Sequence, residues 1–318
     1  MADFSVSTSM SLMRKTAPFV AFRAIVYFAI AVAYVLVTGT GAGIGWGIGA
    51  FGDEEFRAGA TFWGGAIGFG TTAAILYFLR EYILYMVKAG HVAVMVELLD
   101  GRDLPAGKGQ ISFAQDIVKQ RFGQANVLFA IDQLVKGVIR AITGLVEGIA
   151  SLLPIPALDG LMRVVRAFLK VAVGLIDEVI LAHSMRIRAE NPWEASRDAL
   201  VLYGQNAKPM IANAAWIALI TYALTFVVFL LMLAPAGAVV YAIPGAWSAG
   251  GFVFAILFAW AIKAALIEPF AIACLLQAFF KVTEGQEPNP DWVAKLEGAS
   301  AKFSKLGENA QSWIADRT

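Results

Sequence analysis

Long apolar stretches without charged residues dominate the pattern of this chain. From 209 to 262 the sequence contains no Asp, Glu, Lys, Arg or His. A bilayer-spanning helix needs about 20 apolar residues, and a soluble domain has no use for a charge-free run of this length. The run is long enough for two helices that cross a membrane and return. The pattern therefore predicts a polytopic membrane protein.

Four membrane spans are predicted from this pattern. They form a glycine-rich hairpin near the N-terminus and a second hairpin later in the chain, at residues 24–52, 58–79, 211–233 and 250–280. Helix-breaking residues at Pro235-Ala236-Gly237 and Pro244-Gly245 mark the turn of the second hairpin. Pro269 predicts a kink in the last span, because proline removes a backbone donor.

The middle of the chain combines apolar helical periodicity with charge. Each of two helices there carries a single charged stripe, consisting of Asp132, Lys136, Arg140 and Glu147 on the first and Arg163, Arg166, Lys170 and Asp177 on the second. Pro154-Ile155-Pro156 separates the helices, so they can form an antiparallel hairpin with Glu147 facing Arg163 and Lys136 near Asp177. This hairpin either inserts, with its stripes lining a polar cavity, or lies on the cytoplasmic surface.

The predicted fold class is all-α: a polytopic integral membrane helical bundle with four spans and a charged amphipathic helical hairpin. The expected order along the chain is a cytoplasmic N-terminal segment (1–23), the glycine-rich hairpin (24–79), a cytoplasmic helix and loop (80–120), the charged hairpin (121–186), an interfacial segment (187–210), the second membrane hairpin (211–280) and a cytoplasmic amphipathic helix (281–318). Asn191-Pro192 and Asn289-Pro290 are typical of helix starts, with Asn as the cap and Pro in the first turn.

Composition and charge agree with the membrane class. The chain is 59% hydrophobic and only 15% charged, whereas soluble domains carry about a quarter charged residues. Its net charge of +1 gives no reason to expect a nucleic-acid partner. Basic residues before the first and third spans, with an acidic connection after the first, place both termini in the cytoplasm. We expect a bacterial inner membrane protein in contact with lipid.

Glycines in the first span form two ladders with a spacing of four. Gly39, Gly43 and Gly47 lie on one face of the helix, and Gly41, Gly45 and Gly49 lie on nearly the opposite face. Small residues let membrane helices approach closely. The second ladder either mediates self-association or binding to another membrane protein, or it packs inside one chain, where glycines 64, 65 and 68 can supply the partner face.

Two charges inside the last span, Lys263 and Glu268, are the sharpest functional candidates. A charge deep in a bilayer is costly and usually faces a cavity or a partner. Five residues of α-helix separate side chains by about 140°, so the two are not expected to pair with each other. The hairpin residues Asp132 and Arg140 are their candidate partners. The expected substrate or ion path comprises Glu268, Lys263, Asp132, Lys136, Arg140, Glu147 and Asp177; alternatively, Arg140, Arg163, Arg166 and Lys170 bind anionic lipid.

Motifs of enzymes and of metal or nucleotide binding are absent from the sequence. His91 and His183 lack Cys or carboxylate at zinc-ligand spacing, and Cys274 is the only cysteine. There is no Ser-His-Asp order, HExxH or P-loop. The sequence therefore predicts a protein that is not an enzyme, with no cofactor and no metal.

Two segments resemble the choline-transporter-like family. The stretch from Arg121-Phe122-Gly123 to Lys136-Gly137-Val138-Ile139-Arg140 is similar to a family helix in which glycine precedes a run with basic residues. The segment Tyr203-Gly204-Gln205-Asn206-Ala207-Lys208, followed by two apolar helices with an acidic residue in the last, resembles the family's C-terminal part. The likeness covers about 121–303 and is stronger to uncharacterised bacterial multipass proteins than to eukaryotic members.

The resemblance implies a helical membrane bundle that handles choline-like or ethanolamine-like cations, with Glu268 at the family's acidic position. This chain is about half the usual family length and lacks the large extracellular loop. An aromatic cage for a quaternary ammonium would come from Trp216, Tyr222, Phe226 and Trp260. Two functions follow: a transporter or channel-like protein for a small cationic or zwitterionic solute, or a non-transporting scaffold that binds neighbouring proteins or anionic lipid.

Overall fold

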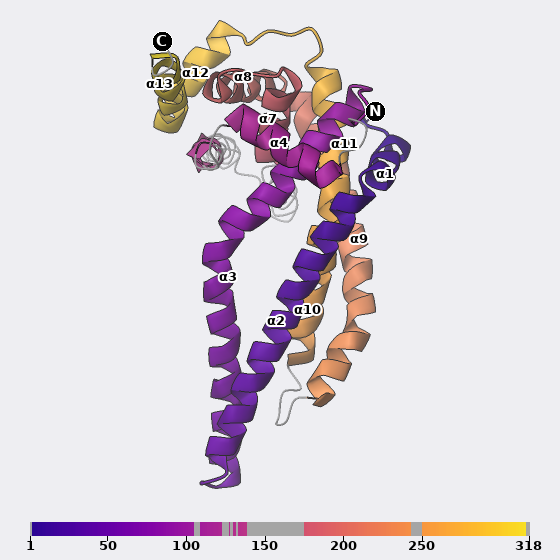
Figure 1. Cartoon of the computed structure of the whole chain (residues 1–318), viewed down its shortest axis with the longest axis vertical. Coiled ribbons are helices and arrows are strands. Elements are labelled where there is room, and N and C mark those ends of the chain that lie inside the picture. The colour runs from indigo at the N-terminus through magenta and orange to yellow at the C-terminus, as the bar shows by residue number, and fades with distance from the viewer. Residues whose placement is uncertain are drawn as a thin grey trace, which may run out of the picture. The chain divides into compact units, whose positions relative to one another are not determined.

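The computed structural model describes residues 2–104, 109–122, 127, 130, 131, 133–138, 175–242 and 250–315 (Figure 1). These residues form helices and, within the described ranges, no strand. The helices are α1 (Val6–Lys15), α2 (Ala17–Gly49), α3 (Glu54–Leu99), α4 (Gln110–Phe122), α7 (Ile176–Arg186), α8 (Pro192–Gln205), α9 (Ala207–Ala242), α10 (Gly250–Ile262), the π-helix η2 (Lys263–Ile267), α11 (Glu268–Val282), α12 (Pro290–Ala299) and α13 (Ala301–Ala315). The predicted all-α class is confirmed.

Two compact units share these helices. Unit 1 consists of Met1–Ala17, Met86–Ile220 and Phe270–Thr318, and unit 2 consists of Pro18–Tyr85 and Thr221–Pro269. Each unit therefore draws on distant parts of the chain, and α3, α9 and α11 contribute residues to both.

Among the described residues, three helical stretches are long and apolar enough to cross a membrane: Ala17–Gly49, Ala207–Tyr241 and Gly251–Val282. The last comprises nearly all of α10, then η2 and α11. These stretches fit an integral membrane protein. The span expected at 58–79 lies within α3 and stays a prediction.

The turn between the last two spans differs from the prediction at one proline. Helix α9 continues through Pro235 and ends at Ala242, so Pro235-Ala236-Gly237 do not turn the chain. Apolar packing explains why the helix tolerates this proline: Ala236 is fully buried with Phe254 and Ala255 of α10 and Ala42 of α2. The second predicted turn, at Pro244-Gly245, lies outside the described residues.

Helices α2 and α3 pack through glycine in unit 2, where they meet as a hairpin (Figure 1). A Cβ atom built on Gly41 would lie 2.2 Å from the Gly64 carbonyl oxygen, and one on Gly64 would lie 2.1 Å from the Gly41 oxygen. Gly45 meets Ala60 and Gly49 meets Arg57 in the same way. The ladder of Gly41, Gly45 and Gly49 therefore packs inside one chain, which is the intrachain alternative from the sequence.

The other glycine ladder remains open. A Cβ atom on Gly43 or Gly47 would meet nothing within 4 Å. Both residues are exposed, while Gly39 is half-buried. Because the Gly41 face is covered by α3, the hypothesis of self-association through that face is wrong for this arrangement. Association between copies through other surfaces stays a prediction.

Unit 1 contains the C-terminal tail, which forms two helices instead of the single one expected. Ser300 separates α12 from α13, and both helices pack on α8. Phe303 and Leu306 of α13 are fully buried, and the Asn191 side chain donates to the Ala310 carbonyl oxygen at 2.9 Å. The two predicted helix starts are confirmed, since Asn191 and Asn289 each accept hydrogen bonds from the first turn of the helix that follows.

Candidate functional site

Three charged side chains meet in unit 2 and form what we call the charged triad: Arg23, Lys263 and Glu268. One Glu268 carboxylate oxygen lies 3.3 Å from the Lys263 Nζ, and the other lies 3.4 Å from the Arg23 Nη2. Lys263 and Glu268 belong to a candidate membrane span, and Arg23 lies on α2, in another. The triad thus gathers two basic groups and one acidic group in segments that are otherwise almost free of charge.

The contact between Lys263 and Glu268 corrects the sequence prediction that these two residues do not pair. The prediction assumed an α-helix, in which side chains five residues apart point about 140° away from each other. The segment Lys263–Ile267 is instead a π-helix, and the Glu268 backbone N–H donates to the Lys263 carbonyl oxygen. Because this pattern bonds residues five apart, it brings the two side chains to the same side.

Burial differs sharply within the triad. The Arg23 side chain is 1% exposed, Glu268 is 18% exposed and Lys263 is 30% exposed. The Arg23 guanidinium also lies 5.9 Å from the centre of the Tyr27 ring, which packs edge-on against Trp260. Arg23 is therefore a fixed part of the unit 2 core, whereas Lys263 and Glu268 form its more accessible side.

Arg23 was missed as a site residue because the sequence interpretation treated it as a charge flanking the first span. Helix α2 begins at Ala17, so Arg23 lies inside the helix rather than before it. Pro18 could have indicated this, because proline is favoured in the first turn of a helix.

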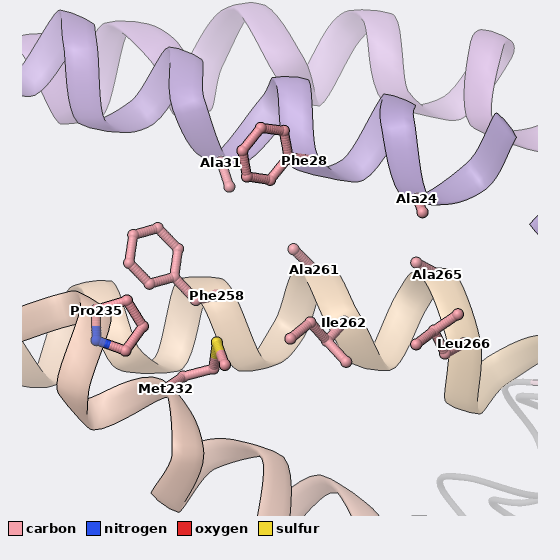
Figure 2. Close-up of a pocket in the computed structure, with 10 residues that line it drawn as sticks. All are labelled: Ala24, Phe28, Ala31, Met232, Pro235, Phe258, Ala261, Ile262, Ala265 and Leu266. Atoms are coloured by element: carbon pink, nitrogen blue, oxygen red, sulfur yellow. The ribbon is translucent and has the colours of Figure 1, made fainter. Parts of the chain in front are cut away.

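A cavity of about 320 Å³ lies between α2, α9 and α10 with η2 in the same unit. Figure 2 shows Ala24, Phe28 and Ala31 of α2 facing Phe258 and Ala261 of α10 across it. The remaining lining residues are also apolar: Met232, Pro235, Ile262, Ala265 and Leu266. Four alanines make the hollow, because their short side chains leave the space between the helices unfilled. The cavity suits an apolar group.

The hairpin residues of the expected path are only partly placed. In unit 1, Lys136 Nζ lies 3.9 Å from an Asp177 carboxylate oxygen, which confirms the predicted proximity of these two residues. The Lys302 side chain of α13 covers Gly137, next to Lys136. Outside the described residues lie Asp132, Arg140, Glu147, Arg163, Arg166 and Lys170, so the partners expected for Lys263 and Glu268 among them stay predictions.

The aromatic residues expected to cage a quaternary ammonium are not among those that line the apolar cavity. Trp216, Tyr222 and Phe226 on α9 are 55%, 43% and 62% exposed. Trp260 packs against Tyr27. The aromatic cage stays a prediction.

Titratable groups outside the candidate spans have shifted pKa values in unit 1. Burial, together with the positive charge of the nearby Arg186, lowers the pKa of His183 to about 4. Burial alone would raise the pKa of Glu178, but Lys88 and Asp177 outweigh it and the net pKa is lowered. Glu178 therefore stays ionised in its ion pair with Lys88, where Nζ and carboxylate oxygen are 3.1 Å apart.

No group of three or more potential metal ligands occurs in the part of the chain that the structure describes. No protein-family model, curated protein or solved structure matches the chain. The resemblance to the choline-transporter-like family therefore stays a prediction. The geometry of the charged triad is the main guide to function.

Proposed function

We propose that this protein is an integral membrane transporter or channel-like protein for a small zwitterionic solute. Lys263 would receive the anionic group of the solute, and Glu268 its cationic group. The observation that carries this proposal is the partly exposed Lys263–Glu268 ion pair inside a candidate span. Intramembrane ionisable residues usually face a substrate or ion pathway.

An exchange of partners explains why an ion pair suits a zwitterion. When the solute enters, each member of the pair gives up an internal partner and gains one of opposite charge from the solute. The total charge in the site does not change, so no uncompensated charge is left in a medium of low dielectric constant. Arg23 remains in place because its main hydrogen bonds are to a backbone carbonyl oxygen.

The triad favours a zwitterion over a purely cationic solute such as choline. It already contains one more basic group than acidic groups. A bare cation would add to that excess, and three of the four aromatic residues expected to compensate for it are exposed on α9. The family resemblance implies choline-like solutes. We restrict this class to solutes that carry both a positive and a negative charge.

The membrane placement belongs to the same proposal. Large apolar side chains are exposed on each candidate span, for example Phe28 on α2, Leu231 on α9 and Phe252 on α10 at 70%, 63% and 63%. Apolar surface of this extent needs lipid around it. On α3, Trp63 and Ile67 are each 66% exposed, which supports a fourth span there. We place the protein in a bacterial inner membrane with both termini cytoplasmic.

Uptake into proteoliposomes tests the proposal, with radiolabelled glycine betaine as the zwitterion and choline as the cation. The variant Lys263→Met/Glu268→Gln removes both site charges without changing the net charge of the triad. We expect it to fold and to lose uptake of glycine betaine.

The matched control is Lys88→Met/Glu178→Gln, which neutralises a Lys–Glu pair of the same type in unit 1. We expect the control to retain uptake. Uptake of choline but not glycine betaine, or equal uptake by the Lys263→Met/Glu268→Gln variant and the wild type, would contradict the proposal.

A second candidate is the non-transporting scaffold that binds neighbouring proteins or anionic lipid. The open glycine face at Gly43 and Gly47 favours it, because a second helix could approach closely there. Cross-linking in native membranes distinguishes the two. A scaffold would yield a defined adduct through Gly43→Cys, and glycine betaine uptake would be absent.

A further inference from the structure

The Ala264 carbonyl group of the last span does not receive its usual bond from its own helix. In an α-helix, the Ala264 carbonyl oxygen would accept from the N–H of residue 268. Here the Glu268 N–H donates to Lys263 instead. The next residue, Pro269, has no N–H to offer a π-type bond to Ala264. An unsatisfied backbone carbonyl is strongly unfavourable in the apolar part of a membrane.

Arg23 of α2 supplies the missing donors. Its Nη2 and Nε lie 2.6 Å and 3.2 Å from the Ala264 carbonyl oxygen. The side chain is almost completely buried at 1% exposure, so water does not compete for this contact. Two N–H groups of one planar guanidinium meet a single oxygen, an arrangement that the single ammonium group of lysine does not reproduce.

The Ala264 carbonyl also determines how Lys263 and Glu268 lie. If the segment were α-helical, Glu268 would bond to Ala264 and its side chain would turn about 140° away from Lys263. With Ala264 bonded to Arg23, the Glu268 N–H is left to bond to Lys263, and the two side chains pair at 3.3 Å. The local helix type thus depends on a residue more than two hundred positions earlier in the chain.

We infer that Arg23 is a positioning residue, which maintains the π-helix Lys263–Ile267 and thereby aligns Lys263 with Glu268. Its role is to bond the Ala264 carbonyl, and it need not contact a solute. Only the expected effect of Arg23 on solute uptake rests on the proposed function. The helix geometry is a separate claim and has its own measurement.

Disulfide formation between positions 263 and 268 measures the helix type directly. A disulfide requires Cα atoms within about 7 Å and side chains that point together, which five residues of α-helix do not provide. The parent is Lys263→Cys/Glu268→Cys on a Cys274→Ser background, since Cys274 is the only native cysteine. The Ala264–Arg23 contact does not involve the replaced side chains. We expect an intramolecular disulfide under mild oxidation.

Arg23→Met should lower the rate of disulfide formation by about tenfold or more. The loss of one hydrogen bond corresponds to a factor of about this size. Arg57→Met is the matched control, because Arg57 is a unit 2 arginine that lies over Trp46 and does not contact the triad. We expect no change for this control.

If Arg23→Met does not fold, a second variant still tests the inference. Arg23→Met/Pro269→Ala removes the proline ring, which clashes with the Ala265 carbonyl in a regular α-helix, and supplies an N–H for that carbonyl. The segment can then form a regular α-helix in which the Glu268 N–H bonds to Ala264. We expect this variant to give a monodisperse protein that does not form the disulfide. A folded double variant that forms the disulfide as fast as the parent would overturn the inference.

Uptake then separates the two claims. In the background with native Lys263 and Glu268, Arg23→Met/Pro269→Ala should lose glycine betaine uptake although both charges are present. If the wild type shows no uptake at all, the proposed function fails while the disulfide result still decides the role of Arg23.

Discussion

The two units use ion pairs in different ways. In unit 1, Arg186 Nε lies 2.9 Å from Asp100, and Arg102 Nη2 lies 3.0 Å from the other Asp100 oxygen. Both arginines are about one-third exposed. These contacts join α7 to the segment that follows α3, and the Asp100 side chain that they share is 13% exposed. In unit 2, the most buried member of the triad bonds mainly to backbone, and its carboxylate partner is shared with Lys263.

This difference shows that similar residues can have different roles in one chain. Ion pairs with partly exposed basic side chains, such as those of Arg186 and Arg102 with Asp100, contribute less to stability, because water screens the charges. The triad combines burial with an irregular helix, and both features are costly unless each polar group has a partner. Removing one charge should therefore affect unit 2 far more than unit 1.

The strongest test of this comparison is Glu268→Gln. It leaves Arg23 and Lys263 without their shared carboxylate, and breaking a buried ion pair on one side costs about 3–5 kcal/mol. We expect a large fall in the thermal unfolding midpoint in detergent. Asp100→Asn, which removes the carboxylate between two partly exposed arginines, should cost about 1 kcal/mol or less. Equal losses for the two variants would contradict the distinction between the units.

A change in pH should sharpen the comparison by acting on unit 1. The folded-state pKa of His183 is lowered to about 4 from its ordinary value of 6.5. Between these values the unfolded chain binds a proton that the folded protein does not, so stability is full above pH 6.5 and falls as the pH drops toward 4. The expected loss is roughly 3 kcal/mol. His183→Gln should remove this part of the pH dependence in thermal unfolding between pH 7 and pH 4.

The next largest expected changes in stability come from two glycines of unit 2. Gly41→Ala would place a methyl group against the Gly64 backbone, and overpacking of this kind typically costs about 1–3 kcal/mol. Gly43→Ala, two residues away on the open face, should instead stabilise α2 by about 0.5–1 kcal/mol. Thermal unfolding of the two variants in detergent measures both effects. A loss of stability for Gly43→Ala would show that its face is covered in the folded protein.

The smallest expected effect concerns a helix cap in unit 1. Asn289 accepts a hydrogen bond from the Asp291 N–H at 2.8 Å at the start of α12. Asn289→Ala should cost about 1 kcal/mol, while Asn289→Asp should retain the cap. Hydrogen exchange of the α12 amides reports this change locally. Unchanged protection of α12 in Asn289→Ala would show that packing on α8 alone fixes the helix.

Regular features of the fold could be predicted from the sequence. Long apolar runs predicted helices that can cross a membrane, and the Asn-Pro pairs predicted two helix starts. The proximity of Lys136 and Asp177 followed from simple reflection about the Pro154–Pro156 turn. In each case the local pattern and the tertiary structure agree, which is why periodicity and turn residues were sufficient.

The charged triad could not be predicted in the same way. Periodicity analysis assigns a fixed rotation to each residue, so it separates Lys263 from Glu268 wherever the helix is regular. In our inference the π-helix depends on a tertiary contact from Arg23. Pro269 indicates an irregular helix here, but it does not indicate which type. Pro235 shows the converse, since packing of α9 with α10 overrides a local helix breaker.

The reciprocal contact of Gly41 and Gly64 also has a mechanical consequence. Where two helices touch backbone to backbone, neither has flexible side chains that can yield, and their Cα–H groups can bond to the facing carbonyl oxygens. That part of the α2–α3 hairpin should move as a single stiff ribbon. The α2 contacts with α9 and α10 instead surround a cavity of about 320 Å³. Any rearrangement of unit 2 is therefore expected to compress or widen this softer side.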